Sequence, residues 1–387
     1  MNLEYIFYIV LFLIIYTYLI YPVLIKIISF KCHLFPQSGK NFSSASIIIS
    51  AYNEEKVIEE RINNIANQKE INFDNIEVLV GSDGSDDRTN QILSRLNEKY
   101  NWLNILLFNE RRGKASVIND LVEQASHEIL IFTDANTHFK QDAVKKLISG
   151  FKNEKIGGIS GRLILQDLQS DSKSGIEERN YWEYETFIKK AEGKCGILIG
   201  ANGGIYAVKK PLFKNLPANR AVTDDFFITL SVLKQDKLFM YEKDSIGIEF
   251  VAPDIKSEFN RKIRFSATNF ETIKMFVSLL FSKRVLLSFA LWSHKIIRWI
   301  VPHLFILAFI TNILLLQKSK IYQVMIGLQL LILCSSVLFY VFKLFGIKFK
   351  LISLINYFNL TNIALFIGFV RFVLRRQSAT WKSTPRN

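Results

Sequence analysis

An acidic residue, Asp134, and an amide two positions later, Asn136, stand where an apolar segment ends. Residues 129–132 read ILIF, and Thr133 leads directly into the carboxylate. A carboxylate is costly to place beside a buried core unless a partner compensates its charge. A divalent cation is such a partner, because hard cations take oxygen ligands. The position of Asp134 therefore suggests an acid that holds a cation, and the amide that follows needs its own explanation.

Polar side chains also follow three earlier apolar segments. An aromatic ring can stack on a base, a carboxylate can accept a hydrogen bond from a base or ribose, and basic side chains can neutralise phosphate. Together they predict a nucleoside diphosphate site, with Asp134 holding a divalent cation against the diphosphate. Any single acid in the set can also be explained as a helix cap. The residues are Tyr52, Asn53 and Glu54 after the first segment, Asp83, Gly84, Ser85 and Asp87 after the second, and Arg112 and Lys114 after the third.

The segments that carry these residues alternate between strand and helix patterns. Residues 46–50 form a short β-branched strand, and the next segment places Ile58, Ile62 and Ile65 at helical spacing. This alternation, repeated through residue 132, predicts an α/β fold with helices on both faces of a mostly parallel sheet. Ligands of such sheets bind at the carboxyl ends of the strands, where the polar residues stand. The sequence has no Walker A lysine motif and no G-x-G-x-x-G motif, which argues against kinases and dinucleotide-binding proteins.

Several motifs follow one another along the chain: SIIISAYNEE, VLVGSDGSDDRT, RRGK, IFTDANT, IGANGGIYAVKK, TDDFFITL and RKIRF. Their order and spacing resemble those of family-2 glycosyltransferases with the type-A fold. The resemblance covers roughly residues 44–265, and the ordered set is more specific than any one motif. It implies a nucleotide-diphospho-sugar transferase domain. The flanking apolar segments make the chain similar to membrane-integrated members such as the synthases of hyaluronan, cellulose and poly-N-acetylglucosamine.

The resemblance implies roles for the residues of the donor site. Tyr52 and Asp83 are expected to contact the nucleobase, and Glu54 is expected to lie near the ribose. Arg112 or Lys114 is expected to steady the nucleotide. These roles define a site for a UDP-sugar donor.

The resemblance also makes Asp134 the first acid of the family's D-x-D metal motif. Asn136 stands where the family often has a second Asp. An amide oxygen can still ligate Mg²⁺ or Mn²⁺, but it brings less charge, so the metal would be held more weakly or more by the diphosphate. In the alternative interpretation, Asn136 caps the loop and touches no metal.

The motif TDD at residues 223–225 implies the catalytic acid–base group. Asp225 is expected to act as the general base that takes the proton of the acceptor hydroxyl as it attacks the sugar, with inversion of the anomeric centre. Asp224 beside it is expected to serve the structure or the acceptor. The alternative for both acids is that they cap the helix that follows.

Two further motifs concern the acceptor or the diphosphate. Gly203, in ANGG at residues 201–204, allows either a close approach of the backbone to donor or acceptor or a tight turn before the next strand. Arg261 and Arg264 match the family's (Q/R)-x-x-R-W motif, but Phe265 replaces the Trp. That motif accompanies processive chain synthesis, and Phe stacks less strongly on an acceptor sugar than Trp. Processivity is therefore left open.

Four apolar segments are long enough to cross a bilayer. The first carries no charged side chain between Glu4 and Lys26, and three more follow at residues 300–316, 321–342 and 351–370. Basic residues interrupt the apolar runs just before residue 300, as in helices that lie on a membrane surface. The expected parts are an anchor at 1–31, the catalytic domain at 44–265, an amphipathic interfacial region at 266–299, membrane helices at 300–374 and a basic tail at 375–387.

The net charge of +14 lies largely beside the apolar segments. This distribution predicts a multi-pass protein of the plasma membrane with a cytoplasmic catalytic domain and an external N-terminus. The basic tail should also be cytoplasmic. One crossing before the domain and three after it would leave the tail outside, so one later segment is expected not to span fully. The soluble part has no basic helix interleaved with aromatics, which argues against nucleic acid as a partner.

The cysteines Cys32, Cys195 and Cys334 are odd in number and far apart. They predict neither a disulfide framework nor a metal cluster, in keeping with a reducing cytosolic environment.

The expected function is transfer of a sugar from a UDP-sugar to a glycan acceptor, in the synthesis of a cell-surface or extracellular polysaccharide. Synthase-complex subunits would be further partners. In an alternative interpretation the enzyme adds a single sugar to a lipid or lipid-linked acceptor. A third interpretation, a non-catalytic nucleotide-sugar sensor or scaffold, conflicts with the complete set of Asp83, Asp134, Asp225 and Arg264.

Overall fold

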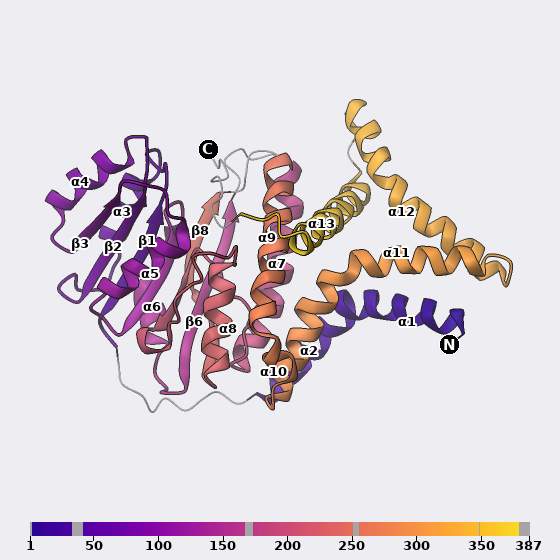
Figure 1. The fold of residues 1–387 in the computed structure, drawn as a ribbon, viewed down its shortest axis with the longest axis horizontal. Coiled ribbons are helices and arrows are strands. Elements are labelled where there is room, and N and C mark those ends of the chain that lie inside the picture. Colours follow the sequence, from indigo (N-terminus) through magenta and orange to yellow (C-terminus); the bar gives the residue numbers. More distant parts are fainter. Residues whose placement is uncertain (1, 33–41, 167–172, 251–254, 348, 379–387) are drawn as a thin grey trace.

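The computed structural model describes residues 2–32, 42–166, 173–250, 255–347 and 349–378. Figure 1 shows an α/β domain built around a sheet on the left and a group of long helices on the right, where the N-terminus lies. The sheet strands are β1 (Ala45–Ala51), β2 (Ile76–Asp83), β3 (Leu103–Phe108), β4 (Ile129–Asp134), β5 (His138–Phe139), β6 (Ile156–Gln166), β7 (Tyr206–Lys209) and β8 (Leu238–Phe250).

The strands form one mixed sheet in the order β3-β2-β1-β4-β7-β6-β8-β5. β1 pairs in parallel with β2 and β4, and β2 pairs in parallel with β3, whereas β7 and β5 run antiparallel to their neighbours. In the parallel part Ser50 lies opposite both Gly81 and Asp134. This register brings the ends of three strands to one edge of the sheet. The predicted α/β fold with a mostly parallel sheet is confirmed.

The apolar residues of the parallel strands face both sides of the sheet. Ile47 and Ile49 are buried in one core with Ile58, while Ile48 is buried in the other core with Val117. Because both faces need cover, the strands read as continuous apolar runs. The helices that supply the cover are α3 (Ile58–Ala66), α4 (Thr89–Lys99) and α6 (Ala143–Ser149) on one face and α5 (Lys114–Gln124) on the other.

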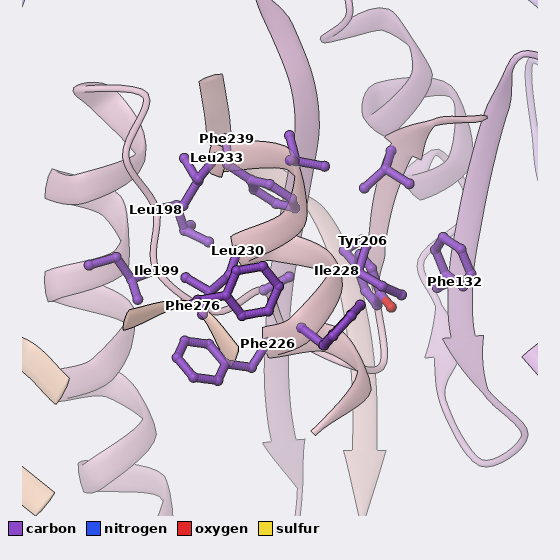
Figure 2. Packing of buried hydrophobic residues seen from close by; sticks show 14 of the residues in the cluster. Phe132, Leu198, Ile199, Tyr206, Phe226, Ile228, Leu230, Leu233, Phe239 and Phe276 are labelled. Carbon is purple, nitrogen blue, oxygen red and sulfur yellow. The ribbon is translucent and has the colours of Figure 1, made fainter. Parts of the chain in front are cut away.

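The helix α8 (Asp224–Lys234), buried between its two ends, positions the two acids of the TDD motif. Every residue from Phe226 to Leu233 is buried, as expected of a core helix that is apolar all round. Figure 2 shows Phe226, Ile228 and Leu230 of this helix packed among side chains such as Tyr206 and Phe239. The other elements of this half are α7 (Lys173–Lys194), the 3-10 turn η2 (Lys210–Leu212) and α9 (Ile255–Met275).

Four helical stretches in the described residues are long and apolar enough to cross a membrane: Leu3–Lys31, Val285–Leu315, Lys320–Phe342 and Lys350–Val373. The second begins inside the region predicted to be interfacial, because the helix continues without a break through residue 300. The elements are α1 (Leu3–Ile15), η1 (Tyr16–Ile20), α2 (Tyr21–Lys31), η3 (Val277–Phe281), α10 (Val285–Ala290), η4 (Leu291–Ile296), α11 (Ile297–Leu315), α12 (Lys320–Leu344) and α13 (Lys350–Val373).

The first two candidate spans lie side by side, α1 against α11 (Figure 1). Each contains a π-helical turn, η1 or η4, and the turns meet: Tyr16 Oη lies 2.7 Å from Ser293 Oγ, and Thr17 Oγ1 donates to the Ser293 carbonyl at 2.7 Å. π-helical turns leave backbone groups displaced from the regular ladder and are frequent at functional sites.

The prediction that the cysteines form no disulfide is wrong. Cys32, just after α2, is bonded to Cys195, just after α7, and Cys334 is a free, exposed cysteine. The two bonded residues are 163 positions apart, so spacing along the chain gave no sign of the pair. The bond ties the first candidate membrane span to the α/β domain.

Candidate active site

A cavity of about 1140 Å³ opens at the edge where the parallel strands end. It collects residues from strand ends that are far apart in the sequence, as the parallel register requires. Among the predicted site residues, Gly84, Ser85, Asp87 and Arg112 do not line it. The others do, and they are Tyr52, Asn53, Glu54, Asp83, Lys114, Asp134, Asn136, Gly203, Asp224, Asp225, Arg261, Arg264 and Phe265.

Asp83 organises one wall of this cavity. Its buried carboxylate accepts backbone N–H groups from Arg112 at 2.6 Å and from Gly113 at 2.9 Å. The following Gly84 has φ +66, and a Cβ there would lie 2.7 Å from the backbone nitrogen of Arg111, so only glycine fits the turn. Asp83 therefore fixes the RRGK loop against the end of β2.

The fixed loop directs its two arginines to different places. The Arg111 guanidinium carbon lies 3.8 Å from the centre of the Tyr52 ring, inside the cavity. The Arg112 side chain points out of the cavity and pairs with Asp120 at 2.6 Å. The structure thus directs Arg111, which the sequence analysis did not select, into the cavity and the predicted Arg112 away from it. The doubled arginine in the motif was the available signal for Arg111.

Lys114, the first residue of α5, joins two acids across the cavity. Its Nζ lies 2.8 Å from Asp134 Oδ1 and 2.8 Å from Asp224 Oδ2. Burial alone would lower the pKa of Lys114, but the two carboxylates raise it well above its ordinary value. The acids of β4 and α8 therefore converge on one positive charge.

The same oxygen atoms suit a divalent cation. Asp134 and Asp224 both contact the ammonium group of Lys114, and Asn136 lines the cavity two residues beyond β4. Hard cations such as Mg²⁺ and Mn²⁺ accept carboxylate and amide oxygens. Among the described residues no group of three or more His, Cys, Asp or Glu side chains is arranged to hold a metal alone. A cation at this place would need further oxygens, such as those of a diphosphate.

Asp225 lies at the N-terminus of α8. Its Oδ1 accepts a hydrogen bond from the backbone N–H of Phe226 at 2.6 Å. A Cβ on Gly203 would lie 3.2 Å from the other carboxylate oxygen, so the glycine lets the ANGG loop pass close to the acid. Burial raises the pKa of Asp225 to about 7, with a further contribution from Asp224, and Lys189 opposes the rise. A carboxyl group near pKa 7 is well matched to proton transfer at neutral pH.

The RKIRF motif lies on α9, on the far side of the cavity. Phe265 is 38% exposed, and the guanidinium groups of Arg261 and Arg264 lie 5.6 and 5.2 Å from its ring centre. Arg261 pairs with Glu258 at 2.8 Å and with Glu178 at 3.3 Å. The motif thus presents one aromatic ring to the cavity, held by two cations.

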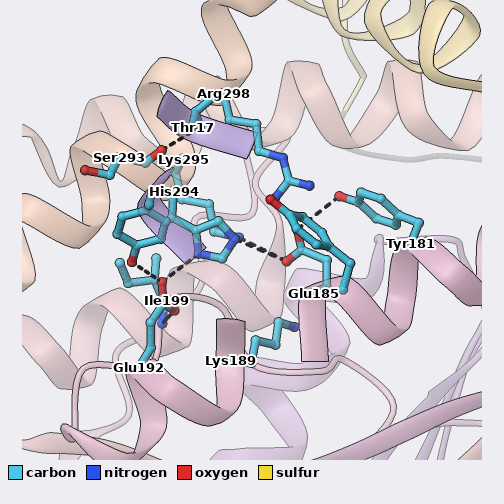
Figure 3. Close-up of polar contacts among 12 residues, drawn as sticks. Thr17, Tyr181, Glu185, Lys189, Glu192, Ile199, Ser293, His294, Lys295 and Arg298 are labelled. Carbon is cyan, nitrogen blue, oxygen red and sulfur yellow. Dashed lines mark hydrogen bonds and ion pairs between the residues drawn. The ribbon is translucent and has the colours of Figure 1, made fainter. Parts of the chain in front are cut away.

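A buried network on α7 connects the cavity to the membrane segments (Figure 3). His294 of η4 bridges two carboxylates, with Nδ1 2.7 Å from Glu192 and Nε2 3.2 Å from Glu185. Glu185 also pairs with Arg298 of α11, and Tyr21 of α2 donates to Glu192 at 2.7 Å. The sequence analysis did not identify these residues, because partners about a hundred positions apart leave no local pattern.

Comparison with known proteins identifies the central part of the chain. Residues 46–213 match the family described as Glycosyl transferase family 2. A poly-beta-1,6-N-acetyl-D-glucosamine synthase of Staphylococcus aureus (strain COL) is 27% identical over 166 residues, which are 43% of this chain and 39% of that protein. The synthase of Staphylococcus epidermidis is 22% identical over 231 residues, 59% of this chain and 55% of its own length. The chain therefore matches well under two thirds of the length of these relatives.

One solved structure matches almost the whole chain. It is the mannosyltransferase PcManGT from Pyrobaculum calidifontis in complex with GDP-Man and Mn2+, with a TM-score of 0.69, 17% identity and coverage of 97% of this chain and 100% of that one. At this identity the likeness shows the fold alone. The predicted resemblance to type-A glycosyltransferases of family 2 is confirmed.

Proposed function

We propose that the chain is a membrane-bound inverting glycosyltransferase, because residues 46–213 match glycosyl transferase family 2. Its donor is a UDP-sugar, and its product belongs to a cell-surface or extracellular polysaccharide. The relatives named as poly-beta-1,6-N-acetyl-D-glucosamine synthases support this assignment. The catalytic domain is taken as residues 44–265, flanked by the candidate membrane spans.

The donor occupies the strand ends. The Tyr52 ring, backed by Arg111 at 3.8 Å, offers a face for the base, and Asp83 lies at the same end of the cavity. Lys114 faces the diphosphate. The diphosphate therefore competes with the carboxylates of Asp134 and Asp224 for the ammonium group of Lys114. Asp134 and Asn136, joined by Asp224, would hold Mg²⁺ or Mn²⁺, which neutralises charge on the leaving diphosphate.

Asp225 is the general base of the transfer. It takes the proton of the acceptor hydroxyl while the hydroxyl oxygen attacks the anomeric carbon from the side opposite the diphosphate. Lys114 helps to stabilise the negative charge that develops on the nucleoside diphosphate. The observation that carries the proposal is that Asp225, with a pKa of about 7, shares one cavity with the Lys114–Asp134 pair. This arrangement also argues against a non-catalytic sensor or scaffold.

The protein is placed in the plasma membrane with the catalytic domain in the cytoplasm. Four candidate spans and basic residues beside them support this placement. The acceptor is a glycan or a lipid-linked group, and two observations favour the second: the cavity reaches residues of the candidate spans, and Phe265 stands where a processive enzyme has Trp.

Incorporation of radiolabelled sugar tests the proposal. Membranes that contain the protein are incubated with radiolabelled UDP-N-acetylglucosamine or UDP-glucose, with Mn²⁺ or with EDTA, and the products are sized. Metal-dependent incorporation above that of membranes without the protein is expected for at least one donor. A lack of incorporation from either donor, in membranes where the protein is folded, would contradict the proposed function.

A further inference from the structure

The cavity does not end at Asp225 but continues along α7 and η4 into the candidate membrane spans. Its lining there combines charged and aromatic side chains of α7 and η4 with apolar side chains of the candidate spans. Two of the lining residues, Leu19 and Leu354, are 66% and 50% exposed and belong to candidate membrane spans. The cavity lining thus includes exposed apolar side chains of helices that could contact lipid. The apolar lining residues are Leu19, Ile332, Leu354, Ile355, Phe358 and Leu365.

Between the catalytic acid and this apolar part, Lys189 places a buried positive charge. Only 7% of the residue is exposed, and its Nζ donates to Asn202 Oδ1 at 2.6 Å and to the Ala201 carbonyl at 3.5 Å. Both acceptors are neutral, and in the described part of the chain no carboxylate lies within 4.0 Å of its nitrogen. Glu185, Asp225 and Glu192 attract the ammonium group only from farther away. Because a buried ammonium group usually has a counterion in contact, a ligand can supply one here.

A second lysine faces the same part of the cavity. Lys295 Nζ lies 4.0 Å from Glu185, whose carboxylate is already shared with Arg298 and His294. Figure 3 shows Lys189 of α7 and Lys295 of η4 on different sides of Glu185. Burial and then Lys295 lower the pKa of Lys189 to about 8, against the opposing attraction of Glu185, Asp225 and Glu192. A bound anion would relieve the repulsion between the two ammonium groups.

We infer that the acceptor is a membrane lipid with an anionic head group, held by Lys189 and Lys295 beside Asp225, with its alkyl chain leaving sideways between η1 and α13. This inference rests on the proposed function and specifies its acceptor. The phosphate of the head group supplies the missing counterion, and the alkyl chain matches the apolar lining. A lipid reaches this part of the cavity directly from the bilayer, so its head group meets the base without crossing water.

The transfer step balances with the groups already described. A hydroxyl oxygen of the head group forms the bond to the anomeric carbon. The bond from that carbon to the diphosphate oxygen breaks, and its electron pair leaves with the nucleoside diphosphate. The hydroxyl proton passes to Asp225, which releases it to solvent when the product leaves.

Lipid binding by the full-length protein tests the inference. The protein is reconstituted in nanodiscs of phosphatidylcholine with one fifth phosphatidylglycerol, whose head group carries a phosphate and hydroxyl groups. Native mass spectrometry measures how much phosphatidylglycerol each variant retains. The variants are Lys189→Met, Lys295→Met and, as a matched control, Lys283→Met, which removes an exposed lysine just before α10. The Tm of each variant shows that it is folded, and calorimetric binding of UDP with Mn²⁺ tests the donor site separately.

We expect Lys189→Met and Lys295→Met each to lower phosphatidylglycerol retention about fivefold, with Lys283→Met within twofold of the wild type and UDP binding unchanged in all. Radiolabel should then appear in an organic-soluble product. Equal retention in all variants, or label only in a water-soluble polymer, would overturn the lipid acceptor while leaving the transferase standing. Lysine-dependent retention without any UDP binding would instead support the lipid site and refute the proposed function.

Discussion

The Nζ atom of Lys114 lies 2.8 Å from Oδ1 of Asp134, so the acid at the end of β4 is paired with a protein cation. The same nitrogen is 2.8 Å from Asp224, on an element more than a hundred residues further along the chain. The positive charge of Lys114 compensates the carboxylate of Asp134, which explains how an apolar strand can end in an acid when no substrate is bound. The pair also predicts competition, because a diphosphate attracts Lys114 and a divalent cation attracts Asp134.

Removal of the Asp134 carboxylate should abolish metal-dependent donor binding. We expect Asp134→Ala to weaken UDP binding in Mn²⁺ at least tenfold and to make it insensitive to EDTA, because an oxygen ligand is lost. Titration calorimetry measures both effects. Asp120→Ala is the matched control, since this acid pairs with Arg112 outside the cavity and is similarly exposed. UDP affinity of Asp134→Ala that equals the wild type with and without EDTA would contradict the donor site.

A methyl group on Gly203 should disturb Asp225 without unfolding the protein. The added Cβ would lie 3.2 Å from a carboxylate oxygen, so Asp225 must shift by a few tenths of an ångström. We expect Gly203→Ala to lower kcat about tenfold, with a small change in Tm and in donor affinity, because a base must be held within hydrogen-bond reach.

Gly327→Ala is the control for this substitution, since no atom lies within 4 Å of a Cβ added there. It should leave kcat within twofold of the wild type. If Gly203→Ala keeps full kcat, the carboxylate of Asp225 does not need the position that the glycine gives it.

The rate of transfer should depend on pH near neutrality. Burial raises the pKa of Asp225 to about 7 in the folded protein, above its ordinary value, and only the ionised form accepts a proton. The profile of kcat/KM should therefore rise with pH, with a midpoint near 7, and reach a plateau above it. For stability the sign is opposite: a raised carboxyl pKa favours the folded state at low pH, and this contribution is lost as pH rises through 7. A kcat/KM that is constant between pH 5.5 and 8.5 would contradict the assignment.

The sequence predicted the parallel part of the fold because its signals are local. The β-branched run at 46–50 and the helical spacing of Ile58, Ile62 and Ile65 describe β1 and α3 almost to the residue. Polar residues at strand ends then follow from topology, which is why Tyr52 and Asp134 line one cavity.

What the sequence could not predict depends on contacts between distant segments. Arg111 rather than Arg112 faces the cavity because backbone bonds to Asp83 fix the loop between them. The pairing of Cys32 with Cys195 and the bridge from His294 to α7 join residues that only the folded chain brings together. Neither leaves a periodic signal, so single-sequence patterns give no access to them.

The end of α13 should lie on the same side of the membrane as the catalytic domain. Ser266 of α9 donates to the carbonyl of Leu365 at 2.8 Å, Phe270 stacks on Phe372, and Ser378 lines the cavity. With the N-terminus outside, α13 then does not add a full crossing, which agrees with the cytoplasmic tail expected from its charge.

Cysteine labelling in intact cells measures this placement. In a Cys334→Ser background, Gln377→Cys should react with a membrane-impermeant maleimide only after permeabilisation. Lys318 lies in the turn after α11 and pairs with Glu4 in the native chain, so Lys318→Cys should react from outside. Labelling of Gln377→Cys in intact cells would place the tail outside and restore four full crossings.

The central claim, that Asp225 is the base of a sugar transfer from UDP, is tested most directly by comparing transfer and donor binding in Asp225→Asn. The amide keeps the shape of the side chain but cannot take a proton at neutral pH. We expect radiolabel transfer to fall by roughly 10²–10⁴-fold, the usual contribution of a general base, while calorimetric UDP affinity in Mn²⁺ stays within threefold of the wild type. Transfer by Asp225→Asn within about tenfold of the wild type, at equal protein and donor concentration, would contradict the claim.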